Sequence, residues 1–209
     1  MIALSLRESG VRVVFTDRVD VVSEAVALIG GGGSPAQLNQ VHSAKVVMID
    51  ESLSEAEPIE ADGIYIPAGH RGLASIRTAD CLPLVVANRN GDAVVLHVGW
   101  RGLTAGIVEA GLAHLGGDGL VAVIGPHIRS CCYEFLGPER YVVAQRFGQA
   151  SFVGDNLSLE LALSGLLLRQ RVQGVVSVDQ CTFCNDVYHS YRRDGTPERQ
   201  MTLVGAGRP

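Results

Sequence analysis

The arrangement of apolar and polar residues in the middle of the chain predicts a β-hairpin. Residues 82–87 and 93–96 are two almost wholly apolar runs, and the Asn-Arg-Asn-Gly-Asp segment between them, residues 88–92, favours a tight reversal. In an antiparallel pair, the start of one strand and the end of the next lie at the same edge of the sheet. Cys81 precedes the first run and His97 follows the second. The pattern therefore places a thiol beside an imidazole.

The rest of the chain mixes strand and helix patterns. Apolar residues spaced three or four positions apart predict helices at residues 21–29, 103–115, 138–147 and 157–172. Apolar runs predict strands at residues 11–15, 45–49, 73–76, 120–124, 175–178 and 200–204, and another directly after residue 63. No internal repeat, coiled coil or low-complexity linker interrupts these elements. The pattern predicts one α/β or α+β domain over residues 1–209.

Two segments are predicted to be loops. Four consecutive glycines at residues 30–33 lack the Gly-Lys-Ser/Thr continuation of a phosphate-binding loop, so we interpret them as a flexible connection. Residues 51–60 contain four Glu and are expected to be solvated.

Composition narrows the classes of partner. The chain has 209 residues, 47% of them hydrophobic, and a formal net charge of -5. The absence of basic runs argues against nucleic acid and anionic membranes as partners. No apolar run approaches the length of a membrane span and no secretory signal pattern is present, so we expect a cytoplasmic protein. Five cysteines, an odd number, favour thiols or metal ligands over a disulfide framework.

The polar residues around Cys81 and His97 favour a functional site at this edge of the sheet. Asp80 stands beside the cysteine, and Trp100-Arg101-Gly102 follows the histidine closely, where a purely structural core would not place them. A Cys and a His together can form a metal site, a nucleophilic pair or two ordinary core residues. A helix that starts just after Gly102 would direct free backbone N–H groups toward the site, which suits an anion.

Two further motifs lie near the C-terminus. Cys181-Thr182-Phe183-Cys184 can be half of a zinc knuckle or a redox dithiol, and because no second Cys-x-x-Cys exists we interpret it as structural. Arg192 and Arg193 can clamp a phosphate or anchor the C-terminal segment through ion pairs.

Several motifs together resemble those of the laccase-domain family, once called polyphenol oxidase. In chain order they are Gln40-Val41-His42, Ala61-Asp62-Gly63, Arg77-Thr78-Ala79-Asp80-Cys81-Leu82-Pro83, His97-Val98-Gly99-Trp100-Arg101-Gly102, Gly125-Pro126, Cys132-Tyr133-Glu134, Cys181-Thr182 and Ser190-Tyr191-Arg192-Arg193-Asp194-Gly195. The resemblance runs from about residue 40 to the C-terminus. Residues 1–39 lack the family's N-terminal motif, His127 stands where a Cys is usual, and Thr196-Pro197-Glu198-Arg199 replaces the expected Thr-Gly-Arg.

The resemblance implies a fold and a metal centre. The fold is an α/β/α-type sandwich around a mixed sheet. The metal is a zinc ion held by His42, Cys81 and His97. Three protein ligands leave the fourth tetrahedral position open, as a catalytic zinc requires. A thiolate and two imidazoles favour zinc, with copper as a possible alternative, over magnesium or calcium.

Members of the family now carry purine nucleoside phosphorylase, adenosine deaminase and methylthioadenosine phosphorylase assignments. The resemblance therefore implies phosphorolysis of adenosine, inosine, guanosine or methylthioadenosine, and deamination of adenosine by water activated on zinc. Arg77 and Arg101 are the candidates to hold phosphate, and Trp100 and Tyr133 to pack on the purine. Arg77, Trp100 and Tyr133 are thus the predicted substrate-binding residues. Asp80, Arg101 and Glu134 are the predicted catalytic residues, the two carboxylates as acid–base groups or supports of the metal ligands.

Two other functions remain open on the sequence. A laccase needs a multinuclear copper cluster built from many histidines, and beyond His42 and His97 the chain has only four, in unrelated contexts. Alternatively, Cys81 can be a nucleophile activated by a histidine in an amide hydrolase, a chemistry related to the peptidoglycan editing linked to some family members. Metal content distinguishes this hypothesis from the zinc enzyme, because a metal-bound thiolate is a poor nucleophile.

Overall fold

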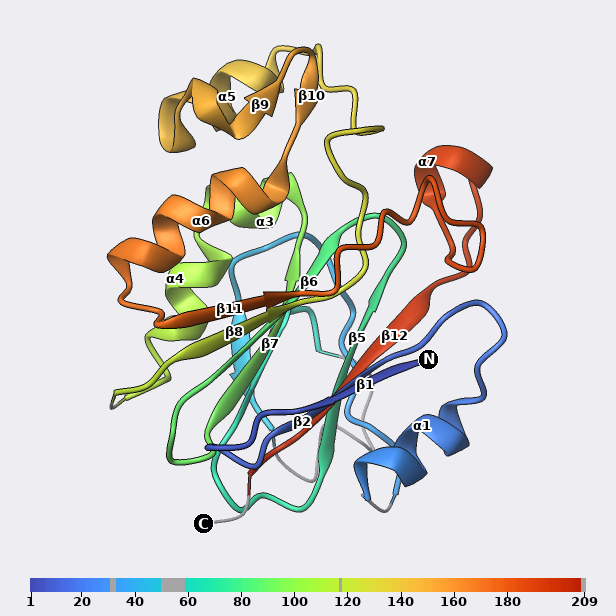
Figure 1. The fold of residues 1–209 in the computed structure, drawn as a ribbon, viewed down its shortest axis with the longest axis vertical. Helices are drawn as coiled ribbons and strands as arrows, with labels where there is room; N and C mark the ends of the chain where they lie inside the picture. The colour runs from blue at the N-terminus through green and yellow to red at the C-terminus, as the bar shows by residue number, and fades with distance from the viewer. Residues whose placement is uncertain (31–32, 50–58, 117, 208–209) are drawn as a thin grey trace.

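The protein contains two stacked β-sheets with helices on the outside (Figure 1). The computed structural model describes residues 1–30, 33–49, 59–116 and 118–207. The larger sheet has the strand order β11-β8-β6-β7-β4-β3 and is mixed, because β11 with β8 and β3 with β4 are parallel while the other pairs are antiparallel. Its strands are β3 (Val46–Met48), β4 (Gly63–Ile66), β6 (Leu82–Ala87), β7 (Ala93–Val98), β8 (Val121–Ile124) and β11 (Gly174–Ser177).

The smaller sheet is antiparallel, with the order β1-β2-β12-β5. Its strands are β1 (Ile2–Ser5), β2 (Arg12–Phe15), β5 (Leu73–Thr78) and β12 (Gln200–Gly205). Side chains alternate between the two faces of a strand. Val85 of β6 therefore packs against the smaller sheet, whereas its neighbours Leu84 and Val86 pack against helices on the opposite face.

Helices cover both outer faces of this pair of sheets. On the larger sheet lie α3 (Trp100–Ala105), α4 (Ile107–Leu112) and α6 (Leu159–Arg169), next to α5 (Glu139–Phe147) and the small hairpin of β9 (Phe152–Val153) and β10 (Asn156–Leu157). The helix α1 (Val22–Ile29) packs on the smaller sheet through Ala25 and Ile29. A short helix, α7 (Tyr191–Asp194), precedes β12. No helix in the described ranges is both long and apolar enough to cross a membrane.

Most predicted elements are confirmed, and the α/β class with a mixed sheet is correct. The structure adds the second sheet, as well as β1, β9, β10 and α7, which are short and carry little periodic signal. The predicted helix at residues 103–115 begins earlier, at Trp100, and is divided in two, because Gly106 adopts a left-handed conformation with φ of 99°. Most of the predicted acidic loop, and the two central glycines of the glycine run, fall outside the described residues.

The central hairpin forms as predicted. Leu82 lies opposite Val98, and Pro83 lies opposite His97. The second strand is two residues longer than predicted, so His97 lies within β7 rather than after it. Cys81 and His97 are consequently held at the same edge by a continuous ladder of backbone hydrogen bonds.

Substitutions at two helical glycines test how closely the helices pack on the larger sheet. A Cβ added to Gly111 of α4 would lie 2.7 and 2.8 Å from the methyl carbons of Leu96, which is fully buried and also fills the space beside Gly63. A Cβ at Gly165 of α6 would meet only the end of the Arg169 side chain, at 3.5 Å. We expect Gly111→Ala to lower the free energy of unfolding by about 1–3 kcal/mol.

The matched variant Gly165→Ala should instead raise the free energy of unfolding by up to about 1 kcal/mol, because alanine favours a helix more than glycine does. Denaturant titration of both variants measures the difference. Equal effects of the two substitutions would contradict the close packing of α4 on β7.

Candidate metal centre

Three potential metal ligands meet at the edge of the larger sheet. Cys81 directly precedes β6, His97 lies in β7, and His42 comes from the loop before β3. Their ligand atoms all lie within 4.8 Å of one another, and Nε2 of His42 is 3.7 Å from Sγ of Cys81. The two imidazole rings are 4.7 Å apart, edge to face. The structure thus brings together the three residues that we predicted as zinc ligands.

A buried carboxylate, Asp62, holds two of these ligands in place. Its Oδ1 lies 2.8 Å from Nδ1 of His97 and accepts the backbone N–H of His42 at 2.9 Å. Its Oδ2 accepts the backbone N–H of Ser43 at 2.6 Å, the hydroxyl of the same residue at 2.8 Å, and the N–H of Val41 at 3.3 Å. One side chain with no exposed surface therefore fixes both the His97 ring and the loop that carries His42.

No role was predicted for Asp62 from the sequence. The signal available was an aspartate at the start of an apolar strand, since a carboxylate in that position must find several hydrogen-bond donors to be buried. The loop is held a second time by Gln40, whose side chain donates to the backbone oxygen of Arg77 and accepts its N–H, both at 2.8 Å. His42 itself has a positive φ of 61°, a strained conformation that these contacts maintain.

The three central groups are electrostatically coupled. Burial raises the pKa of Asp62, but hydrogen bonds from His97 and Ser43 outweigh burial and lower it to about 2. Burial lowers the pKa of His97, while its hydrogen bonds with Asp62 and Cys81 raise it to about 9. Burial raises the pKa of Cys81, and hydrogen bonds from His42 and His97 bring it down to about 6. The site therefore favours a thiolate beside a protonated imidazole, and a divalent cation can take the place of that proton.

The donor set fits a zinc ion. Because Nδ1 of His97 faces Asp62, Nε2 is the nitrogen left to bind a metal, and a carboxylate behind a histidine ligand is the usual support of zinc sites. A thiolate and two imidazoles also suit copper. Gly99 has no side chain, and this leaves room for the potential ligands. A Cβ at this position would lie 2.8 Å from Cδ2 of His42 and 3.1 Å from Sγ of Cys81.

A cavity of about 670 Å³ opens over these ligands. All predicted site residues except Glu134 line it. The lining includes four arginines, which are Arg77, Arg101, Arg192 and Arg199. Among the described residues, Asp80 is the only acidic residue in the lining, so the wall of the cavity carries a net positive charge. Such a cavity suits an anionic substrate.

Asp80 is occupied by structural contacts. Its Oδ1 accepts the hydroxyl of Thr182 and its Oδ2 accepts the backbone N–H of Arg192, both at 2.7 Å, while its backbone oxygen accepts the N–H of Ile128. These contacts maintain a positive φ of 88°. They tie Asp80 to three loops around the cavity, and its role as an acid–base group or as a support of the metal ligands stays a prediction.

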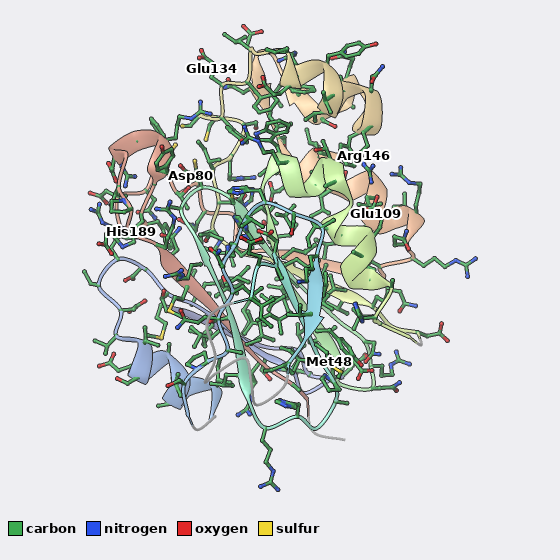
Figure 2. All side chains as sticks on the ribbon, turned by 180° about the vertical axis from the view of Figure 1, so that it is seen from behind. Met48, Asp80, Glu109, Glu134, Arg146 and His189 are labelled. Carbon is green, nitrogen blue, oxygen red and sulfur yellow. The ribbon has the colours of Figure 1, made fainter. Side chains whose placement is uncertain are left out.

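Glu134 does not line the cavity, although its backbone oxygen accepts a hydrogen bond from Arg192 at 3.1 Å. Its side chain is exposed, and its backbone pairs with Asn156 of the small hairpin. In Figure 2, Glu134 lies at the outer end of the molecule while Asp80 lies nearer its centre. Its carboxylate is therefore not among the groups that the cavity brings together, and the catalytic role of Glu134 stays a prediction.

The two adjacent arginines near the C-terminus have different roles. Arg193 donates to the backbone oxygens of Thr182, Phe183 and Tyr188 at 2.8 to 3.0 Å, and so anchors its own loop. Arg192 lies in the cavity wall, with its guanidinium 5.3 Å from the centre of the Tyr133 ring. The sequence motif left both roles open. Arg199 and Tyr191, to which the sequence assigned no role, also line the cavity.

The substitution Asp62→Asn tests the support of the ligands. Whichever way the amide turns, its NH₂ group faces backbone or side-chain donors, so buried N–H groups lose their acceptor. We expect the protein to lose at least about 2 kcal/mol of stability, from penalties of about 1–3 kcal/mol per unsatisfied group. We expect zinc affinity to fall about 10- to 100-fold, as when other supports of histidine ligands are removed.

The matched control is Asp92→Asn. Asp92 also accepts from a backbone N–H and two side chains, those of Tyr65 and Asn88, at the opposite end of the hairpin. It should lose stability but bind zinc as the wild type does, as measured by competition with a metal indicator. Unchanged zinc affinity in Asp62→Asn would contradict the assigned role of Asp62.

Comparisons with known proteins agree on a single family. The family model described as multi-copper polyphenol oxidoreductase laccase matches residues 13–207. A protein of Pseudomonas aeruginosa named purine nucleoside phosphorylase is 36% identical, over 81% of this chain and 73% of its own length. A protein of the same name from Aquifex aeolicus is 31% identical, over 79% of each chain.

Solved structures share the fold. A Neisseria meningitidis protein of the DUF152 family superposes with a TM-score of 0.83 at 24% identity, over 99% of this chain and 98% of that one. The YlmD protein of Geobacillus stearothermophilus gives a TM-score of 0.77 at 20% identity, over 97% and 93%. At these identities the likeness concerns the fold alone. Through the sequence matches, this chain belongs to the laccase-like family that includes proteins named purine nucleoside phosphorylase.

Proposed function

We propose that the protein catalyses phosphorolysis of purine nucleosides at a zinc site formed by His42, Cys81 and His97. The observation that carries this proposal is that one cavity holds both the three potential metal ligands and four arginines. Phosphorolysis needs an anion site beside the sugar, and an arginine-lined wall supplies one. The names of the relatives from Pseudomonas aeruginosa and Aquifex aeolicus support the same reaction.

Arg101 is the arginine best placed to bind phosphate. It follows the first residue of α3, its side chain is exposed, and its guanidinium lies 4.5 Å from the centre of the Trp100 ring. Stacking on an aromatic ring orients the guanidinium while leaving its N–H donors free for an oxyanion. Arg77 lines the same cavity from the end of β5, with its backbone held by Gln40.

The purine is expected to pack between aromatic side chains. Tyr133 and Trp100 both contact Phe135, at 5.6 Å between ring centres, and both line the cavity. Burial raises the pKa of the Tyr133 phenol, so the hydroxyl stays protonated and can donate a hydrogen bond to the base. Aromatic faces favour a flat, electron-poor ligand.

In the proposed reaction, a phosphate oxygen forms a bond to the anomeric carbon of the sugar, and the bond from that carbon to the base nitrogen breaks. The electron pair leaves with the base, which then takes up a proton. Arg101 and Arg77 orient the phosphate, and Asp80 keeps the surrounding loops in place through Thr182 and Arg192. When bound, a zinc ion would act as a Lewis acid toward substrate or water. Deamination of adenosine is the second activity proposed for this cavity.

A cysteine nucleophile is the second candidate function. His97 lies between Asp62 and Cys81; burial raises the pKa of the thiol, and hydrogen bonds from His42 and His97 together lower it to about 6. A thiolate, an imidazole and a carboxylate in series resemble the arrangement of cysteine hydrolases. The positive cavity and the third ligand, His42, favour the metal enzyme. A multinuclear copper oxidase is less consistent with the structure, because two of the further histidines that it would need have other contacts. His114 stacks on Tyr65, and Nδ1 of His127 hydrogen-bonds with the backbone oxygen of Gly125.

The substitution Arg101→Ala tests the phosphate site. Losing charge-assisted hydrogen bonds of about 1.5–3 kcal/mol should raise KM for phosphate about 10- to 100-fold, with a smaller effect on kcat. The unfolding midpoint should not change, since the side chain is exposed. Deamination, which uses no phosphate, should be affected less.

The matched control is Arg169→Ala, which removes an exposed arginine at the end of α6, outside the cavity. Its phosphorolysis kinetics should equal those of the wild type. An unchanged KM for phosphate in Arg101→Ala would remove Arg101 from the phosphate site.

A further inference from the structure

A second group of potential metal ligands lies outside the cavity. Cys131 and Cys132 belong to the loop after β8, and Cys181 and Cys184 to the loop after β11. Because β8 and β11 are parallel neighbours, the loops that follow them emerge side by side. Two backbone hydrogen bonds join the two loops. The N–H of His127 donates to the oxygen of Gln180 at 3.2 Å, and the N–H of Thr182 donates to the oxygen of His127 at 3.0 Å. The Cys-x-x-Cys motif therefore has two further cysteines as partners, which the sequence spacing did not reveal.

The four sulfur atoms have the spacing of a tetrahedral metal site. They all lie within 4.8 Å of one another. Sγ of Cys184 is 3.2 Å from that of Cys132 and 3.5 Å from that of Cys131. Four thiolates bound to zinc at about 2.3 Å lie about 3.8 Å apart at tetrahedral angles.

A backbone hydrogen bond prepares one sulfur for a metal. The backbone N–H of Arg129 donates to Sγ of Cys181 at 3.5 Å. A backbone donor to a sulfur favours its thiolate form, which is the form that binds metal. Such bonds to a ligand are the outer support that metal sites usually have.

We propose that Cys131, Cys132, Cys181 and Cys184 bind a structural zinc ion. Four thiolates form a closed coordination shell, so this site is not catalytic. The ion would connect the loop that carries Tyr133 to the loop that carries Thr182, whose hydroxyl holds Asp80. It would thereby fix two walls of the cavity with respect to each other. The proposal does not depend on the reaction that the cavity catalyses.

The chain has five cysteines, and Cys81 is the one that does not belong to the proposed site. This allows a specific test. In the variant Cys81→Ser, every remaining thiol belongs to the proposed site. We expect this variant to retain one zinc per chain after dialysis. Its four thiols should react slowly with a thiol reagent and quickly once a chelator is added, and the chelator should lower the unfolding midpoint by several degrees.

The double variant Cys81→Ser/Cys184→Ser should lose the zinc. If it does not fold, cobalt substitution of the single variant Cys81→Ser replaces it, since intense sulfur-to-cobalt charge transfer and tetrahedral d–d bands can arise there only from these four cysteines. Four reactive thiols without bound metal, and no such spectrum, would overturn the proposal. Two missing thiols with the mass of a disulfide would overturn it as well.

Discussion

The site depends on the hydrogen bond between Asp62 and His97. A carboxylate with no exposed surface is costly to bury, and this one is stabilised by the imidazole and by the backbone N–H groups of residues 41–43. The same contacts orient His97 in the sheet and shape the loop of His42. Without this carboxylate, the His97 ring would lose its hydrogen-bond partner, and the loop of His42 would lose the contacts of residues 41–43 but keep those of Gln40 with Arg77.

The sheets place the remaining parts of the site around this point. The β6–β7 hairpin delivers Cys81 and His97 to one edge, and the smaller sheet ends at the same edge with Arg77 in β5. The loops after β8 and β11 form another wall and meet at Asp80. A rigid two-sheet core thus positions a cavity whose walls are loops, which is where substrate-binding residues are usually found.

The sequence predicts those parts of the site that depend on local pattern. Cys81 and His97 could be paired because two apolar runs and a turn define a hairpin, whereas His42 required the family resemblance. Asp62 was missed because its importance lies in contacts with a loop 20 residues away. Glu134 adjoins Tyr133 in the sequence, yet only Tyr133 lines the cavity, because adjacency in the chain does not fix which side chains reach a site.

Long-range contacts also explain the other differences. Arg192 and Arg193 are equivalent in the sequence, and only the fold turns one into the cavity and the other onto its loop carbonyls. The second sheet was not predicted, because β12, at the end of the chain, pairs with β2 near its start and β5 in the middle. Neither pairing leaves a local signal.

The most direct test of the proposed function is to follow the products formed from inosine with and without phosphate, by wild-type protein and by Cys81→Ala. We expect the wild type to release hypoxanthine and ribose 1-phosphate in equal amounts, only when phosphate is present. We expect Cys81→Ala to lose this activity together with the metal of the His42, Cys81 and His97 site. Product formation without phosphate, or full activity in Cys81→Ala, would contradict the proposed function.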